Sequence, residues 1–298
     1  MEIQDLETIS ITNKMVQKVF GSEITVLEDI LSIEEPLEIR LKYIQDNEVY
    51  NQTISVTMRT PGNDVELALG FLFTEGIISS YEAIQEVNHL EKNCALQKKN
   101  SIQVVLNDGF TPHLLQSDRN FYTTSSCGVC GKSSIESIKT VSPFKSSNKP
   151  KFDISASVLY QLPQKLRAAQ SDFANTGGIH ASGLFSKEGE LLLLQEDVGR
   201  HNALDKLIGQ AFAKGLLPLH QHILLLSGRI SFELVQKAAM AGISIVVAIG
   251  APSSLAVELA QEFGMTLIGF LNENRFNIYH SATTITLLTE KEQTLIPN

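Results

Sequence analysis

The sequence predicts an α/β protein in which a smaller α+β domain precedes a larger layered domain. In the second half of the chain, short and fully apolar runs alternate with segments of helical pattern. Apolar strands without polar alternation are typical of a sheet that has helices on both faces. In the first half, apolar and polar residues alternate at period two over 36–41 and 52–58, which indicates antiparallel strands with one solvated face.

The first half is expected to contain a hairpin, a helix and a further strand. The two alternating segments should form the hairpin around a turn at Asp46-Asn47-Glu48. A helix over Asp64–Thr74 should begin at an Asn63 cap and end at Gly76. Residues 1–20 should form a loose lead-in or a first strand, 82–90 a polar helix or loop, and 101–106 a strand.

The second half is expected to alternate between helices and strands, with Asp197 as a helix N-cap. Helices are expected at 158–170, 198–212, 232–241 and 254–263, and strands at 181–185, 191–195, 223–226, 243–249 and 266–271. The polar stretch between Pro143 and Pro150 is the best linker in the sequence. We therefore predict a small α+β domain over 1–140, a linker over 141–152 and the layered α/β domain over 153–298.

Composition excludes several classes of protein. The chain has 298 residues, 43% hydrophobic and 19% charged, which is typical of a globular protein. Its net charge of −9 argues against nucleic-acid and anionic-membrane partners. The acidic, polar start at Met1–Asp5 predicts no signal peptide, and no apolar run is long enough to span a bilayer. Three cysteines do not make a disulfide scaffold, so we expect a cytoplasmic protein with reduced thiols.

Two of the three cysteines form a C-x-x-C motif, Cys127 and Cys130, within a run of small and hydroxyl-bearing residues. Such a run cannot build a core, and it predicts a solvent-reachable loop. Ser133 and Glu136 fit a capping box, so a helix is expected to start just after the cysteines. A nearby helix N-terminus and Lys132 would favour the reactive thiolate form.

The motif alone leaves several chemistries open. A thioredoxin-like site usually places the first cysteine at the helix start within a βαβ unit, a context that is weak here. A closed zinc site needs four ligands, and the sequence has no second C-x-x-C or H-x-x-x-H pair. His180 and His201 could complete such a site in space, although nothing in the spacing requires it. Single-cysteine chemistry is therefore favoured over disulfide exchange and zinc binding.

Three polar clusters lie where the layered sheet would present a ligand: Asn175–His180, Glu196–Lys206 and Ser227–Ser231. The first has two glycines that permit close backbone approach, followed by His180. In the third, a strand-to-helix turn at Gly228 and Arg229 suits an anion such as phosphate. The alternative to a binding role is that Asp197 is only a helix cap and that His180 is a structural histidine.

The blocks of residues around these clusters resemble the FdhD family of sulfur carrier proteins required for active formate dehydrogenase. The resemblance runs from about Arg59 to Tyr279. It rests on RTPG at 59–62, SSCGVCGK at 125–132, TGGIH at 176–180, EDVGRHNA at 196–203, SGRISFE at 227–233, APSS at 251–254 and the segment from Gly269 to Asn277.

The resemblance implies a fold, a cofactor and site residues. It implies a cytidine-deaminase-like α/β domain and a homodimer. It implies that Cys127 carries a persulfide with the assistance of Cys130. The segment Phe270-Leu271-Asn272-Glu273-Asn274-Arg275 matches the family's cofactor-binding stretch. Our own interpretation of the strand ends adds Gly228 and Arg229, which would hold guanine and phosphates, and His180 and Asp197 as polar candidates lining the same pocket. The H-x-E and P-C-x-x-C motifs of zinc deaminases are missing, which argues against deamination and a resident metal.

These observations lead us to expect a sulfur carrier that is a sulfurtransferase. Sulfur would pass from a cysteine desulfurase to a molybdenum bis(pyranopterin guanine dinucleotide) cofactor, or its tungsten analogue, for formate dehydrogenase. Two alternatives remain: a C-x-x-C thiol-disulfide oxidoreductase, and a cofactor-binding chaperone without sulfur transfer.

Overall fold

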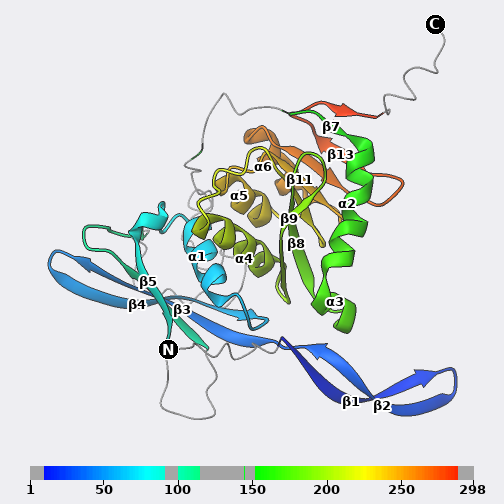
Figure 1. Cartoon of the computed structure of the whole chain (residues 1–298), viewed down its shortest axis with the longest axis horizontal. Helices are drawn as coiled ribbons and strands as arrows, with labels where there is room; N and C mark the ends of the chain where they lie inside the picture. The colour runs from blue at the N-terminus through cyan, green and yellow to red at the C-terminus, as the bar shows by residue number, and fades with distance from the viewer. Residues whose placement is uncertain (1–9, 91–99, 115–143, 145–151, 288–298) are drawn as a thin grey trace, which may run out of the picture.

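The computed structural model describes residues 10–90, 100–114, 144 and 152–287. These residues form a mixed α/β structure, as expected, with two main sheets (Figure 1). The four-stranded sheet consists, in spatial order, of β4 (Glu48–Arg59), β3 (Glu35–Gln45), β6 (Ser101–Leu106) and β5 (Ile84–His89). The six-stranded sheet consists of β13 (Asn277–His280), β12 (Thr266–Gly269), β11 (Ile245–Ala248), β10 (Ile223–Leu226), β8 (His180–Phe185) and β9 (Leu191–Asp197).

Helices cover both faces of the six-stranded sheet, which confirms the layered arrangement of the second half. In β10, Ile223 and Leu225 pack with α2, whereas Leu224 and Leu226 pack with the helices of the opposite face. The helices are α2 (Ala156–Ala169), α3 (Ser171–Thr176), α4 (Arg200–Ala213), α5 (Phe232–Met240) and α6 (Ser254–Glu262). Strands β10, β11 and β12 run parallel, so their carboxyl ends meet at one edge of the sheet. None of the helices in the described ranges is long and apolar enough to cross a membrane.

The predicted hairpin of the first half is confirmed. Strands β3 and β4 pair antiparallel around a two-residue turn. Asp46 and Asn47 occupy the turn with φ of 52° and 64°, the left-handed backbone that a tight hairpin turn requires and that these residue types tolerate. Helix α1 (Asp64–Thr74) also forms where it was predicted.

Two local predictions are wrong, and a third is only partly right. Residues 84–89 form strand β5 rather than a polar helix or loop, because pairing with β6 overrides a polar sequence. Asn63 occupies the predicted N-cap position of α1, but its side chain makes no capping hydrogen bond, since its amide donates to Gln195 Oε1 at 2.9 Å. Asp197 does not cap the next helix, because it is the last residue of β9 and Gly199 is the N-cap of α4.

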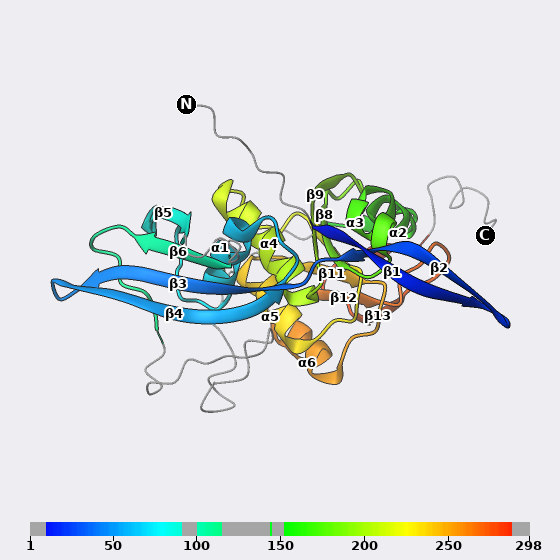
Figure 2. The same cartoon turned by 90° about the horizontal axis from the view of Figure 1, so that it is seen from below.

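The chain before β3 forms a projecting hairpin of two ten-residue strands. Strand β1 (Ile11–Phe20) pairs antiparallel with β2 (Glu23–Ser32) along its whole length. Figures 1 and 2 both show this hairpin extending away from the body. Two hydrogen bonds hold its base to α3, from Ser10 Oγ to Asp172 Oδ1 at 3.0 Å and from Ser32 Oγ to Thr176 Oγ1 at 2.9 Å. Two further short strands, β7 (Ile154–Ser155) and β14 (Ile285–Thr286), pair with each other in parallel.

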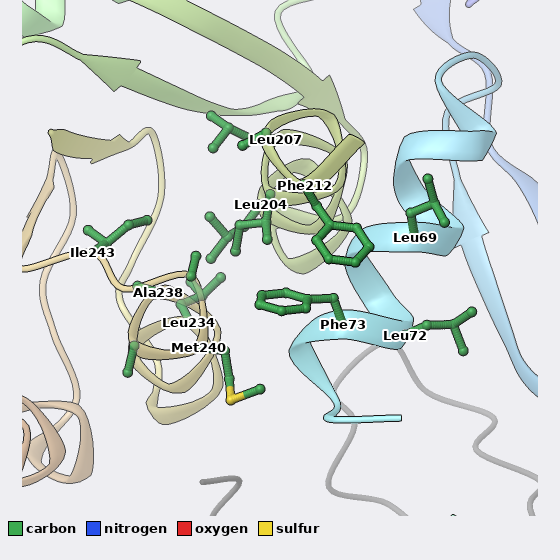
Figure 3. Close-up of a cluster of buried hydrophobic side chains, with 14 of the residues drawn as sticks. Leu69, Leu72, Phe73, Leu204, Leu207, Phe212, Leu234, Ala238, Met240 and Ile243 are labelled. Carbon is green, nitrogen blue, oxygen red and sulfur yellow. The ribbon is translucent and has the colours of Figure 1, made fainter. Parts of the chain in front are cut away.

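Helices α1 and α4 join the first half of the chain to the second. Figure 3 shows Phe73 of α1 beside Phe212 of α4, and these rings stack with centroids 4.9 Å apart. The two backbones come unusually close: a Cβ at Gly70 would lie 1.9 Å from the carbonyl oxygen of Asp205, and a Cβ at Gly209 would lie 1.9 Å from that of Glu66. Only glycine permits this approach.

Buried ion pairs reinforce the same junction. Lys206 Nζ of α4 lies 2.7 Å from Asp197 Oδ2 and donates to the carbonyl oxygen of Thr60 at 2.9 Å. Lys237 of α5 lies 3.0 Å from Asp205 of α4 and 3.1 Å from Glu75. One hydrophobic core extends through both halves. The division at 141–152 stays a prediction, because most of that segment lies outside the described residues.

Candidate functional site

The candidate site is built where the parallel strands end. The turns after β10, β11 and β12 are joined by backbone hydrogen bonds: Gly250 N donates to Gly228 O at 3.2 Å, and Phe270 N donates to Gly250 O at 3.1 Å. Gly250 is required here, since a Cβ would lie 2.8 Å from the Gly228 carbonyl oxygen. The carboxyl edge of parallel strands is where open α/β sheets bind ligands.

A cleft of about 680 Å³ opens at this edge. It brings together parts of all three polar clusters: Gly177, Gly178 and His180 from the first, Val198 from the second and Ser227 from the third. The remaining lining comes from α2, α3 and neighbouring turns: Pro163, Gln164, Arg167, Gln170, Phe173, Ile179, Ile249 and Glu273. Small-molecule sites commonly span about 300–1,000 Å³, and the volume of this cleft lies within that range.

His180 begins β8 and lines the cleft. Its ring packs against the third cluster, because a Cβ at Gly228 would approach Cε1 and Nδ1 of this ring to 3.2 Å. Burial, followed by the positive charge of Arg200, lowers the pKa of His180. The ring is therefore neutral at pH 7 and can accept as well as donate a hydrogen bond.

The first two residues of α4 lie next to His180. Arg200 has a buried Nε atom without a hydrogen-bond partner among the described residues. His201 Nε2 lies 3.1 Å from Ser231 Oγ and 4.0 Å from Glu233 Oε2. Burial, followed by the charge of Arg200, lowers the pKa of His201 to about 3. His201 is thus a neutral residue that connects the starts of α4 and α5.

Asp197 does not line the cleft, contrary to the sequence-based expectation. Its side chain is fully buried and pairs with Lys206. It also accepts hydrogen bonds from the backbone amides of Thr60 at 3.1 Å and Gly199 at 2.8 Å and from Asn202 Nδ2 at 3.1 Å. With every lone-pair direction used, Asp197 holds β9, α4 and the Thr60 turn together and faces no ligand.

The segment Phe270–Arg275 divides into residues that face solvent and residues that do not. Phe270 has φ of 55°, a strained value for an aromatic residue, and its side chain is 41% exposed. Leu271 is buried in the core beside α2. Asn272 accepts from the amides of Asn274 and Arg275 at 2.9 and 3.0 Å, which closes the loop. Glu273 is the member of this segment that lines the cleft.

The sequence reasoning missed the wall of the cleft that α2 contributes. Arg167 places its guanidinium 3.6 Å from the centroid of the Phe173 ring, and both side chains line the cleft. Pro163, Gln164 and Arg167 share one side of α2, so a polar stripe within this amphipathic helix was the available signal. Arg229 is exposed but does not line the cleft.

Cys94, Cys127 and Cys130 lie outside the described residues. Within the described ranges, no group of three or more histidine, cysteine, aspartate or glutamate side chains could hold a metal ion.

Comparison with known proteins identifies the family. Residues 33–286 match the FdhD/NarQ family. The chain is 48% identical over 260 residues to "Sulfur carrier protein FdhD" of Mycolicibacterium paratuberculosis, covering 86% of this chain and 92% of that protein. It is 43% identical over 253 residues to the protein of the same name from Sulfolobus acidocaldarius, covering 85% and 89% of the two chains.

A solved structure supports the fold. The crystal structure of a candidate formate dehydrogenase accessory protein from Desulfotalea psychrophila superposes with a TM-score of 0.68 at 22% identity, covering 92% of this chain and 98% of that one. The family match spans most of this chain, including the three polar clusters and the C-x-x-C motif. The chain therefore belongs to the FdhD/NarQ family.

Proposed function

We propose that this chain is a sulfur carrier required for formate dehydrogenase activity. The observation that carries the proposal is its identity of 41–48% to proteins named sulfur carrier protein FdhD, over at least 85% of this chain. The accessory protein from Desulfotalea psychrophila has a similar fold and a name that refers to formate dehydrogenase. The C-x-x-C motif supplies the thiols that a sulfur carrier needs.

Cys127 accepts the sulfur in this proposal. Its thiolate attacks the terminal sulfur of a cysteine persulfide on a cysteine desulfurase, and the desulfurase cysteine leaves as a thiolate. No net oxidation occurs, and Cys127 becomes a persulfide. Cys130 either activates this persulfide or attacks Sγ of Cys127. In the second route a Cys127–Cys130 disulfide forms, and the terminal sulfur leaves as sulfide with the two electrons that the cysteines give up.

The cleft at the sheet edge is proposed to bind the acceptor, a bis(pyranopterin guanine dinucleotide) cofactor of molybdenum or tungsten, which is a substrate here. Arg167 suits a phosphate group, and Gly177 and Gly178 leave room for one against their backbone. The neutral ring of His180 offers a hydrogen bond, and the exposed ring of Phe270 beside this edge can stack on a base. Glu273 lines the cleft, and Leu271 supports the loop from within. Gly228, Arg229, Asn272, Asn274 and Arg275 lie outside the cleft lining and are proposed to contact parts of the cofactor that extend beyond it.

The remaining expectations belong to the same proposal. They are a cytidine-deaminase-like arrangement of the second half, a cytoplasmic location, a homodimer, and encounters with a cysteine desulfurase and with formate dehydrogenase.

The test is sulfur loading measured by intact mass. The full chain is incubated with a cysteine desulfurase and cysteine, and its mass is measured before and after treatment with a thiol reductant. We expect a reductant-sensitive gain of one sulfur atom in the wild type and in Cys94→Ala, which removes the cysteine outside the motif. Cys127→Ala should gain none.

The alternatives give different results. A cofactor-binding chaperone gains no sulfur, and Cys127→Ala/Cys130→Ala then still supports active formate dehydrogenase. A thiol-disulfide oxidoreductase forms a reversible Cys127–Cys130 disulfide and turns over dithiol substrates without the cofactor. Either result would overturn the carrier assignment.

A further inference from the structure

The cleft at the sheet edge carries two opposite charges that are not paired with each other. Arg167 of α2 and Glu273, in the turn after β12, both line it. Among the described residues that line the cleft, Glu273 has the only carboxylate. Arg167 lies over the Phe173 ring, and neither Arg167 nor Glu273 forms an ion pair with any described residue. The cleft therefore holds a cation and an anion that are both available to a ligand.

The turn that carries Glu273 is fixed by hydrogen bonds at its start and at its end. Phe270 N donates to Gly250 O at 3.1 Å. Asn272 N donates to Arg275 O, and Asn272 Oδ1 accepts from Arg275 N, each at 3.0 Å. The side chain of Phe270, three residues before Glu273, is 41% exposed. The turn thus offers an aromatic ring and a carboxylate on a preformed backbone, which lowers the entropy lost on binding.

The carboxylate restricts which chemical group can lie beside it. An ionised carboxylate has two oxygens that only accept hydrogen bonds, so Glu273 selects a ligand edge that carries donors. Guanine has two adjacent donors on one edge, N1–H and N2–H, which match the two oxygens of one carboxylate. Adenine and cytosine have a ring-nitrogen acceptor beside the amino group, and uracil has a carbonyl oxygen on each side of its N–H. Those acceptors would face the carboxylate lone pairs, which disfavours the three other bases.

We propose that Glu273 selects guanine by accepting hydrogen bonds from N1–H and N2–H of the bound base. Phosphate of the same ligand reaches Arg167, so the two unpaired charges recognise the two ends of one guanine nucleotide. Phe270 stacks on the base from the same turn. This inference rests on the proposed function, in which the cleft binds a guanine dinucleotide, and it names the side chain that distinguishes guanine from other bases.

The test is the affinity of the full chain for four nucleoside diphosphates, measured by calorimetry. The wild type should bind inosine diphosphate, which lacks the 2-amino group, about tenfold more weakly than guanosine diphosphate, because one hydrogen bond to a charged group is lost. It should bind adenosine diphosphate about 100-fold more weakly or worse, because the lone pair of adenine N1 faces the carboxylate.

Glu273→Gln should reverse the preference between guanosine and xanthosine diphosphate. A glutamine amide has one acceptor and one donor, which match N1–H and O2 of xanthine but not the two donors of guanine. A gain in affinity for xanthosine diphosphate cannot result from misfolding. Glu258→Gln makes the same change of charge at an exposed position of α6 outside the cleft, and it should keep the wild-type order of affinities.

The outcomes separate this inference from the proposed function. Equal affinity of the wild type for guanosine and adenosine diphosphate would overturn the role of Glu273 and leave the cleft as the cofactor site. A Glu273→Gln variant that still prefers guanosine to xanthosine diphosphate would do the same. A wild type that binds none of the four nucleotides would overturn the cleft as the cofactor site, and this inference with it.

Discussion

The close contact between α1 and α4 predicts that Gly70→Ala strongly destabilises the protein. An alanine Cβ at this position would lie 1.9 Å from the Asp205 carbonyl oxygen and 2.8 Å from the Gly209 amide nitrogen. Both are backbone atoms within a helix, so no side-chain rotation can relieve the overlap. The helices must instead separate by roughly 1 Å or more, a gap that forfeits a quarter to a half of each affected contact.

The magnitude follows from three contributions. Overpacking in a well-packed core costs about 1–3 kcal/mol. Separation also disturbs the buried ion pair of Asp205 with Lys237 and its hydrogen bond from Thr74 Oγ1, which is 2.8 Å long. Alanine's better helix propensity offsets about 1 kcal/mol. With about 1 kcal/mol lost from the disturbed ion pair and hydrogen bond, we expect a net loss of roughly 1–3 kcal/mol in the free energy of unfolding.

Urea unfolding followed by circular dichroism measures this loss. Gly178→Ala is a matched control, because its Cβ would meet nothing closer than 3.8 Å and its backbone φ is not positive. The control should unfold within about 0.5 kcal/mol of the wild type. If Gly70→Ala were as stable as the wild type, the account of the helix contact would be refuted.

Three further predictions concern the ion pair, pH and the cleft. Lys206→Met should lower the free energy of unfolding by about 3–5 kcal/mol, because it leaves Asp197 buried and unpaired. The double variant Asp197→Asn/Lys206→Met should regain part of that loss. If the single and the double variant had the same free energy of unfolding, the pairing of Lys206 with Asp197 would be contradicted. The unfolded state protonates His201 below about pH 6.5, whereas the folded state keeps it neutral down to about 3, so stability should fall by about 2 kcal/mol between pH 7 and pH 5 on its account. Urea unfolding of His201→Gln should show a weaker loss over that interval, and an unchanged pH dependence would contradict the neutral assignment. Arg167→Ala should weaken the binding of guanosine diphosphate about tenfold, measured by calorimetry. The control Lys187→Ala, which changes a lysine just after the other end of β8, should bind as the wild type does. Equal affinity of the two variants would exclude Arg167 from the phosphate contact.

Periodicity was sufficient to predict the strands and helices that carry a regular apolar face. An apolar run such as Ile223–Leu226 buries side chains on both faces only in a sheet that is covered on both sides. Helices α2 and α4 cover this sheet on opposite faces. The pattern failed at β5, whose Gln85, Glu86 and Asn88 have low strand propensity and whose conformation is imposed by pairing with β6.

The sequence reasoning placed polar clusters at the edge of the layered sheet but did not predict how their side chains pair. Gly177–His180 and Ser227–Arg229 lie at the same sheet edge, because Ser227–Arg229 follows β10 and Gly177–His180 leads into β8, which runs antiparallel to β10. The sequence could not show that Lys206, nine residues after Asp197, turns back to neutralise that carboxylate, since this depends on how α4 packs against β9. Arg167 was missed because α2 is far in sequence from the strand ends, and only the folded structure places this helix beside the cleft.

In the proposed function, sulfur on Cys127 reaches the cofactor of formate dehydrogenase. The most direct measurement loads the chain with radiolabelled sulfur from cysteine and a desulfurase, removes the donor, and mixes the chain with cofactor and inactive formate dehydrogenase. The sulfur carrier account predicts that label appears in the cofactor extracted from the enzyme, together with formate oxidation, in the wild type and in Cys94→Ala but not in Cys127→Ala. Equal label in the cofactor with Cys127→Ala would contradict it.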